Sequence, residues 1–531
     1  MRSLTDRLAL HATERGSAPA LVALHPGSEP EITTWAELHA ASQRFAAAVA
    51  TRTAPGDLVP LFARPSAESI AAMLGVLAAG RLFSVLHHQL RGPQISGVLE
   101  AGGVGLAVVD GPGIPTLKRA FEGRLADTDW WVLQGRSYGA VHETQRAKLV
   151  AAGARLEGVP EGSPAEPARD AGLTGGTCLF TSGSTGVPKG VVIAHPELVS
   201  RAAGEVAWFG LTADDVLLNV LPFSFDVGLN QLLSSLYVGC TLVLCPSFLP
   251  ADLLAAVEGQ RVTGISAVPS IWTGMLQARV GFDTAGAHRS LRFLTISGGD
   301  LLPSQRTALA AAAPGVGIFK TYGQTETFRT ASLHPDELAT HGDTVGRALA
   351  GVRLVVLRPD GSAADPGEPG EIVHGGAGLM RGYLGQPEAT AEKLRYCPVL
   401  GEVAAYTGDR GMLDAEGRLT LLGRGDGMLK ISGFRVFPSE ILAQLSHVEG
   451  VVEAVVTAPK DATGATRLVA FVVLEHGSSL TAHGVRQALG RLLPAYMVPE
   501  RVELRESLPR TSSGKPDAVG LTAEAAGLLE P

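Results

Sequence analysis

Short apolar runs alternate with segments of helical periodicity along most of this 531-residue chain. The runs have the lengths of strands and are flanked by Gly, Pro or Ser, as at Leu217–Leu221, Thr241–Leu244 and Leu291–Ile296. Between them, Ala251–Gln260 and Pro303–Ala312 are rich in Ala and Leu at helical spacing. Strands that alternate with helices predict an α/β protein with layered, partly parallel sheets.

The last fifth of the chain has a different texture. Val451–Ala458 and Leu468–Glu475 have strand patterns, and Ala482–Leu492 has the pattern of a helix. About 100 residues is a common size for one domain. We therefore expect a large N-terminal domain over residues 1–424 and a small α+β C-terminal domain over residues 425–531.

The composition excludes several classes of protein. Hydrophobic residues make up 45% and charged residues 18%, which is enough apolar material for packed cores and too little charge for a disordered chain. The formal net charge of -8 argues against binding of nucleic acid through bulk positive charge. No stretch approaches 18 uninterrupted apolar residues, so we expect no membrane span.

The cellular location follows from the start of the chain and from its cysteines. Asp6 and Glu14 interrupt the first apolar pattern, which is not typical of a secretory signal. No metal-ligand or redox spacing relates the four cysteines, Cys178, Cys240, Cys245 and Cys397. We expect a cytoplasmic protein whose thiols are buried and reduced.

The stretch Phe180–Gly190, FTSGSTGVPKG, has the character of a phosphate-binding loop. Glycines let the backbone approach a phosphate, Ser and Thr hydroxyls bind its oxygens, and Lys189 neutralises charge. The spacing is not that of the Walker motif. A flexible Ser/Gly loop is the alternative, but the Pro188–Lys189 pair and the strand-like run after it argue against that interpretation.

This loop and several further motifs resemble the adenylate-forming superfamily of acyl-CoA synthetases, luciferases and peptide-synthetase adenylation domains. The motifs follow the family's order over nearly the whole chain: TWAEL (Thr34–Leu38), TSGSTGVPKG, SGGD (Ser297–Asp300), YGQTE (Tyr322–Glu326), GEIVHGGAGLMRGYL (Gly370–Leu384), YTGDRG (Tyr406–Gly411), GRGDGMLKISGFRV (Gly423–Val436), LPAYMVPE (Leu493–Glu500) and LPRTSSGKPD (Leu508–Asp517). The resemblance implies a large layered domain, a small mobile domain, and an enzyme that joins a carboxylate to the α-phosphate of ATP.

The resemblance also implies where ATP binds. Asp409 would accept hydrogen bonds from the ribose hydroxyls, as carboxylates do in other nucleotide sites, with Arg424 in support. On its local sequence alone, Asp409 is alternatively a turn aspartate. The remaining implied ATP-binding residues are Thr181, Ser182, Gly183, Ser184, Thr185, Gly186 and Lys189 in the phosphate loop, Gly298 and Gly299 against the base, and Tyr322, Gly323 and Gln324 in the YGQTE motif.

Three residues would carry the chemistry. Because negative charge gathers on the phosphorus during the transfer, positioning and electrostatics supply most of the catalysis. Lys515 aligns with the family lysine that bridges the carboxylate and the α-phosphate; the alternative is a surface lysine in a terminal loop. Thr325 would bond the α-phosphate, and Glu326 would hold Mg²⁺, which prefers one or two carboxylates plus phosphate oxygens.

A second half-reaction would pass the acyl group to a thiol. Asp426 aligns with the hinge about which the small domain rotates between the two half-reactions. The rotation would remove Lys515 and bring in the strand from Lys430 to Gly433 to line the thiol tunnel. Lys430 is alternatively a simple lysine at a strand edge.

The segment Leu221–Leu233, LPFSFDVGLNQLL, bears on the acid that is activated. In family members that activate amino acids, the aspartate of the F-D pair binds the substrate ammonium, and Phe225 and Asp226 match that pair. A carboxylate in an apolar run is costly unless it is paired. Alternatively, Asp226 caps a helix that starts at Val227.

The rest of the substrate pocket carries over by position. The implied residues are Asn230, Ile296, Gly298, Thr321, Arg329 and Thr330. A guanidinium at Arg329 suggests a second substrate carboxylate held bidentately, as in an aspartate-like acid; a β-amino acid would also suit Asp226. Alternatively, Arg329 binds a structural carboxylate or the phosphates of an incoming pantetheine.

We predict an ATP- and Mg²⁺-dependent ligase that activates a small, amino-bearing carboxylic acid in a biosynthetic pathway. No phosphopantetheine attachment motif follows Lys515 and no condensation domain comes first, so we expect a stand-alone chain that loads a discrete carrier protein. An acid–CoA ligase for a non-amino acid is the alternative. A binding protein without chemistry and a luciferase-like oxygenase are more distant alternatives, and His87 and His88 receive no functional account.

Overall fold

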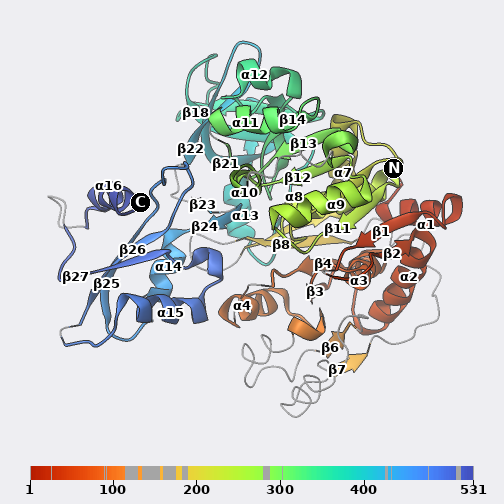
Figure 1. The fold of residues 1–531 in the computed structure, drawn as a ribbon, viewed down its shortest axis with the longest axis horizontal. Helices are drawn as coiled ribbons and strands as arrows, with labels where there is room; N and C mark the ends of the chain where they lie inside the picture. Colours follow the sequence, from red (N-terminus) through yellow and green to blue (C-terminus); the bar gives the residue numbers. More distant parts are fainter. Residues whose placement is uncertain are drawn as a thin grey trace. The chain divides into compact units, whose positions relative to one another are not determined.

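The computed structural model describes residues 2–25, 27–88, 90, 92–113, 129–133, 156–158, 175–181, 189–278, 287–301, 303–424, 429–431, 433–445, 447–475, 477–509 and 516–529. Its fold class is α/β, as predicted from the alternation of strands and helices (Figure 1). The chain divides into a larger unit, Met1–His88 with Val98–Phe180 and Gly190–Gly425, and a smaller unit, Gln89–Gly97 with Thr181–Lys189 and Asp426–Pro531.

A mixed sheet of nine strands carries the YGQTE motif, and the SGGD motif follows directly after one of its strands. Its central strands pair in parallel, as expected for strands linked through helices, whereas β2, β15 and β16 pair antiparallel at the two edges. Across the sheet the strands are β16 (Arg347–Ala348), β15 (Phe328–Leu333), β14 (Gly317–Gln324), β13 (Phe293–Ile296), β12 (Gly264–Ala267), β10 (Val216–Asn219), β11 (Thr241–Leu244), β1 (Pro19–Ala23) and β2 (Glu31–Thr34).

Two further sheets complete the strands of the larger unit. One has eight strands, in the order β19 (Gly382–Tyr383), β9 (Lys189–Ala194), β8 (Gly176–Thr181), β4 (Leu82–Val85), β3 (Leu58–Phe62), β5 (Leu106–Val109), β6 (Asp129–Val132) and β7 (Leu156–Gly158). The other is antiparallel, with β17 (Val352–Leu357), β18 (Gly370–Gly376), β21 (Glu402–Leu413) and β20 (Leu394–Cys397) in order and β22 (Leu419–Arg424) paired to β21.

Helices lie between these strands, and several begin at side-chain caps. Ser3, Thr34 and Ser66 each form a capping box that satisfies N–H groups at the start of a helix. The helices are α1 (Leu4–Glu14), α2 (Trp35–Arg52), α3 (Ala67–Ala78), α4 (Gly92–Gly102), α7 (His195–Phe209), α8 (Asp226–Val238), α9 (Pro250–Gln260), α10 (Pro269–Gln277), α11 (Pro303–Ala312), α12 (Leu338–His341) and α13 (Pro387–Lys393), with 3-10 turns η1 (Gly111–Gly113), η4 (Ala287–Ser290) and η5 (Pro335–Glu337).

The smaller unit combines strands and helices, as the C-terminal sequence pattern predicts. Its strands are β23 (Leu429–Ile431) and β24 (Phe434–Val436) in one pair, and β25 (Val451–Thr457), β26 (Val469–Leu474) and β27 (Arg501–Arg505) in a sheet. Its helices are α14 (Pro438–Leu445), α15 (Ala482–Leu492) and α16 (Ala518–Leu528), with the turn η6 (Ala495–Met497). Val472, Val485 and Leu489 belong to one buried cluster of its own.

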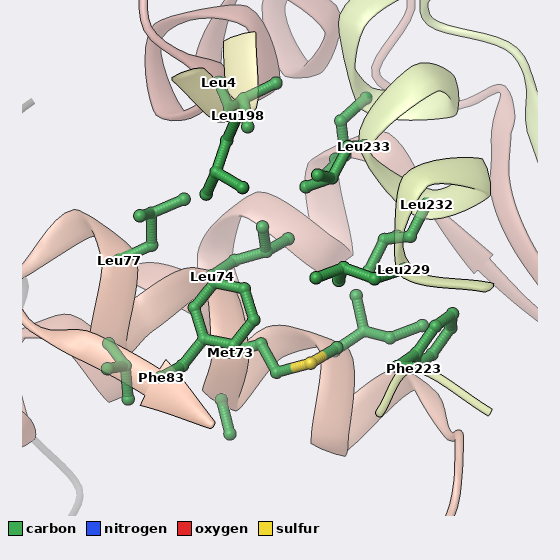
Figure 2. Close-up of a cluster of buried hydrophobic side chains, with 14 of the residues drawn as sticks. Leu4, Met73, Leu74, Leu77, Phe83, Leu198, Phe223, Leu229, Leu232 and Leu233 are labelled. Atoms are coloured by element: carbon green, nitrogen blue, oxygen red, sulfur yellow. The ribbon is translucent and has the colours of Figure 1, made fainter. Parts of the chain in front are cut away.

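The main core of the larger unit joins elements that are far apart in the sequence. Figure 2 shows ten labelled side chains of this cluster, from α1, α3, β4, α7, α8 and the turn before α8: Leu4, Met73, Leu74, Leu77, Phe83, Leu198, Phe223, Leu229, Leu232 and Leu233. Each is at most 2% exposed. Because α7 and α8 pack on one another in this cluster, it fixes the two helices that bear Glu205 and Asp226.

Three of the four cysteines agree with the expectation of buried thiols. Cys178, Cys240 and Cys397 are buried free thiols, and Cys245 is half-buried. Burial raises the pKa of the Cys178 and Cys240 thiols well above their usual value, so both stay protonated at neutral pH. Among the helices in the part of the chain that the structure describes, none has the length and apolar character needed to cross a bilayer.

Truncation of Leu229 tests this core. We expect Leu229→Ala to lower the free energy of unfolding of the larger unit by about 2–5 kcal/mol, because it removes apolar contacts and leaves a cavity. All five tryptophans precede residue 273, so urea unfolding followed by tryptophan fluorescence reports on the larger unit. Leu249, which is 66% exposed, supplies the matched control Leu249→Ala. Equal small losses in the two variants would contradict the assignment of this core.

Candidate active site

The YGQTE motif forms the end of the hairpin between β14 and β15. A Cβ atom added at Gly323 would lie 1.5 Å from the carbonyl oxygen of Phe328, so only glycine fits where the two strands meet. The register shifts between Tyr322 and Gly323, and Phe328 adopts φ 61°. This close approach leaves Thr325 and Glu326 in the turn, between two strands that are anchored in the nine-stranded sheet.

Two side chains of β14 in this hairpin donate hydrogen bonds to Asp409 on β21. The hydroxyl of Tyr322 donates to Asp409 Oδ2 at 2.5 Å, and Gln324 Nε2 donates to the same oxygen at 2.7 Å. Asp409 is 7% exposed and lies within a strand rather than a turn, where its backbone pairs in register with that of Arg424 on β22. The structure therefore brings together the side chains of Tyr322, Gln324 and Asp409, three of the residues predicted to bind ATP.

Lys393 also belongs to this group, although its sequence context did not predict it. Its ammonium donates to Gln324 Oε1 and to the carbonyl oxygen of Thr407, both at 2.9 Å. Because Gln324 Oε1 accepts from Lys393, its amide nitrogen is directed at Asp409. Lys393 ends a short helix, α13, where a lysine is ordinary, so no sequence signal separated it from a surface residue.

Glu326 lies in the turn with its carboxylate buried. Its side chain is 3% exposed, and the Tyr383 hydroxyl donates to Oε1 at 2.9 Å. Its backbone carbonyl accepts from Met380 N at 2.7 Å. The turn is therefore held from outside the hairpin, by residues that follow β18.

A magnesium ion suits this carboxylate. Among the residues that the structure describes, no group of three or more His, Cys, Asp or Glu side chains is placed to hold a metal. Mg²⁺ bound with ATP takes one or two protein carboxylates and draws its other ligands from phosphates and water. A single buried oxygen donor at Glu326 fits that requirement.

Arg201 is a second residue of the site that the sequence did not predict. Its Nη2 donates to the carbonyl oxygens of Thr325 at 3.2 Å and Gly378 at 2.6 Å. Burial lowers its pKa to about 10, against the raising effect of Asp226, Glu197 and Glu326, so the guanidinium stays charged at neutral pH. An arginine within a helical pattern such as that of α7 is typical of a solvent-facing residue, so the sequence pattern did not assign Arg201 to the site.

Asp226 is the first residue of α8, and Phe225 is the N-cap. Among the residues that the structure describes, no side chain caps this helix, and Asp226 Oδ1 accepts from the adjacent Val227 N at 2.7 Å. The capping alternative is thus not supported. Asp226 is half-buried rather than enclosed in apolar side chains, and its charge is favourable at a helix N-terminus. Because Asp226 is only half-buried and its charge is favourable at the helix N-terminus, its burial alone does not require pairing with a substrate ammonium.

Arg329 forms a buried ion pair with Glu205 of α7. The side chains are 4% and 3% exposed. Arg329 Nη1 also donates to Thr321 Oγ1 at 2.6 Å and to Ser297 Oγ at 3.3 Å. Glu205 accepts a further hydrogen bond from Ser234 Oγ at 3.0 Å. The guanidinium already has a carboxylate partner, which favours the structural alternative over a second substrate anion.

The other predicted pocket residues divide into two groups. Asn230 is buried near this pair, because its Nδ2 donates at 3.4 Å to Ser234 Oγ, which bonds Glu205. Thr330 is also buried, but its hydroxyl lies against Thr327 in the turn before β15 and against His374 on β18. Ile296 does not join them, because its side chain belongs to the apolar cluster with Leu294. Side chains alternate along a strand, so Thr295 and Ser297 take the polar side instead.

The sequence itself contains the pattern that separates Ile296 from its polar neighbours, because polar and apolar residues alternate at the end of β13. Thr295 Oγ1 lies 3.0 Å from Ser297 Oγ, which lies 2.8 Å from Thr321 Oγ1. A period of two along β13 pairs Thr295 with Ser297 and places Ile296 on the opposite face. Gly298, with φ 76°, and Gly299 follow in the loop after that strand.

His87 and His88 lie together, with ring centroids 4.4 Å apart, and the His87 ring is 6.3 Å from that of Phe225. Burial lowers the pKa of His87 to about 3, and burial likewise lowers that of His88. An uncharged, buried His87 packed against Phe225 agrees with a structural role.

Several predicted residues lie outside the described residues or away from this group. Ser182, Gly183, Ser184, Thr185, Gly186, Asp426 and Lys515 are outside the part of the chain that the structure describes. The two ends of the predicted phosphate loop are described, and there Thr181 Oγ1 donates to the carbonyl oxygen of Lys189 at 3.4 Å. In the smaller unit, Lys430 is exposed on β23, and Gly433, with φ 87°, forms the turn to β24. The roles predicted for these residues stay predictions.

Comparison with known proteins assigns the family. The AMP-binding enzyme family matches residues 8–384, and the AMP-binding enzyme C-terminal domain matches residues 440–515. The chain belongs to the AMP-binding enzyme family. The resemblance to the adenylate-forming superfamily is thereby confirmed.

Curated relatives of this family member include synthases and synthetases that are much longer than this chain. It is 29% identical over 485 residues to bacitracin synthase 3 of Bacillus licheniformis, an alignment that covers 90% of this chain and 7% of that protein. It is 33% identical over 357 residues to delta-poly-L-ornithine synthetase of Acinetobacter baumannii (strain AB307-0294), covering 65% of this chain and 26% of the relative. The chain thus spans a small part of these relatives.

Solved structures match over almost the full length. Amide bond synthetase McbA from Marinactinospora thermotolerans has a TM-score of 0.82 at 24% identity, over 98% of this chain and 99% of that one, which shows the fold. A double mutant of o-succinylbenzoate CoA synthetase (MenE) from Bacillus subtilis has a TM-score of 0.80 at 25% identity, over 98% of both chains. Ligases of different product classes therefore share this fold.

Removal of one partner from the Glu205–Arg329 pair tests its structural role. We expect Arg329→Met to lower the free energy of unfolding by about 3–5 kcal/mol, because it leaves a buried carboxylate uncompensated. Addition of Glu205→Met should restore much of that loss, and a double-mutant cycle by urea unfolding measures the coupling. If Arg329→Met left stability unchanged and abolished only the use of dicarboxylic acids, Arg329 would be a substrate-binding residue after all.

Proposed function

We propose that this protein activates a small, amino-bearing carboxylic acid by ATP-dependent adenylation and then transfers the acyl group to the thiol of a carrier protein. The observation that carries the proposal is the β14–β15 hairpin. It places Tyr322 and Gln324 on Asp409 and, two residues on, holds the buried carboxylate of Glu326. A nucleotide needs a hydrogen-bond acceptor for its ribose and a metal-binding oxygen near its phosphates, and the hairpin together with Asp409 of β21 offers both.

In the first half-reaction, an oxygen of the substrate carboxylate attacks the α-phosphorus of ATP while the bond to the bridging oxygen breaks and pyrophosphate leaves. The chain's task is to align the reactants and to stabilise the negative charge that develops. Asp409 accepts from the ribose, Thr325 bonds the α-phosphate, and Lys515 bridges the two reacting groups. Glu326, together with the phosphates, would hold Mg²⁺, and the ion would supply positive charge beside the transferring group.

In the second half-reaction, a thiol attacks the acyl carbonyl carbon and AMP leaves. We propose that the chain from residue 425 onward rotates about Asp426 between the two steps and that Lys430 and Gly433 then line the path of the thiol. Asp426 begins the longest segment of the smaller compact unit, which agrees with a hinge at this point. A hinge needs only a few residues at the end of an element to absorb the change.

Two observations support an amino group on the substrate, the position of Asp226 and the names of the relatives. A half-buried carboxylate at the start of α8, without a capping bond to the next turn, remains available to a ligand ammonium. A relative at 33% identity carries the name delta-poly-L-ornithine synthetase, and ornithine is an amino acid. Neutral α-amino acids and β-amino acids fit this carboxylate, whereas the pairing of Arg329 with Glu205 removes the support for an aspartate-like substrate.

Coenzyme A is the second candidate for the acceptor. The match to o-succinylbenzoate CoA synthetase over 98% of both chains favours it specifically. The two acceptors share the phosphopantetheine thiol, so they differ in what surrounds that arm. An acid–CoA ligase would release its product, whereas a carrier protein would retain it covalently.

Acid-dependent ATP–pyrophosphate exchange tests the proposal. We expect exchange with at least one α- or β-amino acid, and we expect Asp226→Asn to reduce kcat/KM for that acid by about 100-fold, because it removes the charge that pairs with the ammonium. The panel includes dicarboxylic, aryl and fatty acids. Asp214→Asn, at an exposed aspartate in the loop before β10, is the matched control.

Other outcomes of this assay would contradict parts of the proposal. Exchange with a non-amino acid, unaffected by Asp226→Asn, would contradict the amino-acid substrate and favour the CoA ligase. Equal effects of Asp226→Asn and Asp214→Asn would contradict a specific role for Asp226. Absence of exchange with every acid, in the presence of ATP and Mg²⁺, would contradict adenylation itself.

A further inference from the structure

A chain of buried hydrogen bonds links the turn that carries Glu326 to a histidine on β18. Gln324 N donates to Thr327 Oγ1 at 3.3 Å, and Thr327 Oγ1 lies 3.2 Å from Thr330 Oγ1. Thr330 Oγ1 lies 2.9 Å from His374 Nδ1, and His374 Nε2 lies 2.8 Å from the carbonyl oxygen of Ala377. Thr327, Thr330 and His374 are 0% exposed, so no solvent completes these bonds.

The direction of each bond in this chain is fixed by chemistry. The Ala377 carbonyl can only accept, so His374 Nε2 carries a proton. Burial, reinforced by the positive charge of Arg201, lowers the pKa of His374 to about 4, so Nδ1 is bare and accepts from the Thr330 hydroxyl. Thr330 in turn accepts from the Thr327 hydroxyl. Every hydroxyl therefore donates once and accepts once, starting from the Gln324 N–H.

The segment that follows His374 contacts the same turn at successive residues. Met380 N donates to the backbone oxygen of Glu326 at 2.7 Å, and the Tyr383 hydroxyl donates to its carboxylate at 2.9 Å. Gly378 lies so close that a Cβ atom there would be 2.8 Å from the carbonyl oxygen of Thr327. With φ 90°, Gly378 has a conformation that other residues rarely adopt. One stretch, residues 374–383, thus fixes the turn through both backbone and side chains.

We propose that His374 is a positioning residue for adenylation: in its neutral form it ends the hydrogen-bond chain that holds the Gln324–Thr327 turn, and through that turn it places Thr325 and Glu326 for ATP and Mg²⁺. This inference rests on the proposed function, because it assigns His374 to the geometry of that same site. His374 acts only through other residues, so we do not count it as a catalytic residue.

Loss of the histidine would leave a defined defect. With leucine at position 374, the Thr330 hydroxyl has no acceptor at Nδ1, and the carbonyl of Ala377 loses its donor. The Thr330 hydroxyl can then donate to Thr327 Oγ1 instead of accepting from it. It would compete there with the N–H of Gln324. A displacement of about 1 Å at catalytic groups can reduce a rate by about 100-fold.

The test compares two pairs of variants on the full chain. His374→Leu removes the end of the hydrogen-bond chain, and His374→Asn keeps an acceptor in the position of Nδ1. Thr327→Val removes one hydroxyl at constant volume, and Thr327→Ser restores it. The matched control is His195→Leu, because His195 is also 0% exposed, also has a pKa lowered to about 4 by burial, and bonds Leu4 N of α1.

The readouts are kcat and KM of ATP–pyrophosphate exchange, the affinity for MgATP by calorimetry, and the melting temperature. We expect His374→Leu and Thr327→Val to lower kcat by about 10- to 100-fold and to weaken MgATP binding more than binding of ATP without metal. We expect His374→Asn and Thr327→Ser to recover most of both losses. We expect His195→Leu to lower the melting temperature while kcat and MgATP affinity stay within about twofold of wild type.

Two results would overturn the inference. The first is a change in melting temperature alone for His374→Leu and Thr327→Val, with kcat and MgATP affinity unchanged. The second is an equal loss of kcat in His195→Leu. A wild-type protein that binds MgATP but exchanges pyrophosphate with no acid contradicts the proposed function instead, and the metal-dependent affinities of the variants then decide the role of His374. A wild-type protein that fails to bind MgATP overturns both.

Discussion

The contact between Gly323 and the carbonyl of Phe328 is the constraint on which the candidate site depends. The two strands of the hairpin approach so closely at this point that any side chain at residue 323 would collide with backbone. The approach forces the short turn from Gln324 to Thr327, and the turn determines where Thr325 and Glu326 lie. A looser hairpin would leave the same residues in the sequence without a common geometry.

The turn is held by partners that are distant in the sequence. Arg201 on α7 bonds the backbone of Thr325, residues 374–383 contact Glu326 and Thr327, and Asp409 on β21 accepts from the strand side of the hairpin. Each partner is itself anchored in a helix or a sheet. A site built in this way is preorganised, because the scaffold rather than the ligand supplies the ordering.

Much of this arrangement could be predicted from the sequence, and the reasons for the misses are physical. The alternating pattern predicted the α/β class, and the order of motifs predicted the family and the grouping of Tyr322, Gln324 and Asp409. Tertiary partners were not predictable: Lys393 and Arg201 lie on ordinary helical patterns, and only the folded chain shows what they contact. The carry-over by position also placed Ile296 in the pocket, whereas the period of two along β13 directs it into the core.

The most direct test of the account is the affinity for MgATP, measured by isothermal titration calorimetry on wild type and on Asp409→Asn. Because Asp409 accepts from Tyr322 and Gln324 and is proposed to accept from the ribose, we predict that Asp409→Asn weakens binding by at least about tenfold. Asp360→Asn, at an exposed aspartate in a loop, should bind as wild type does. Equal affinities for wild type and Asp409→Asn would contradict the assignment of this hairpin as the nucleotide site.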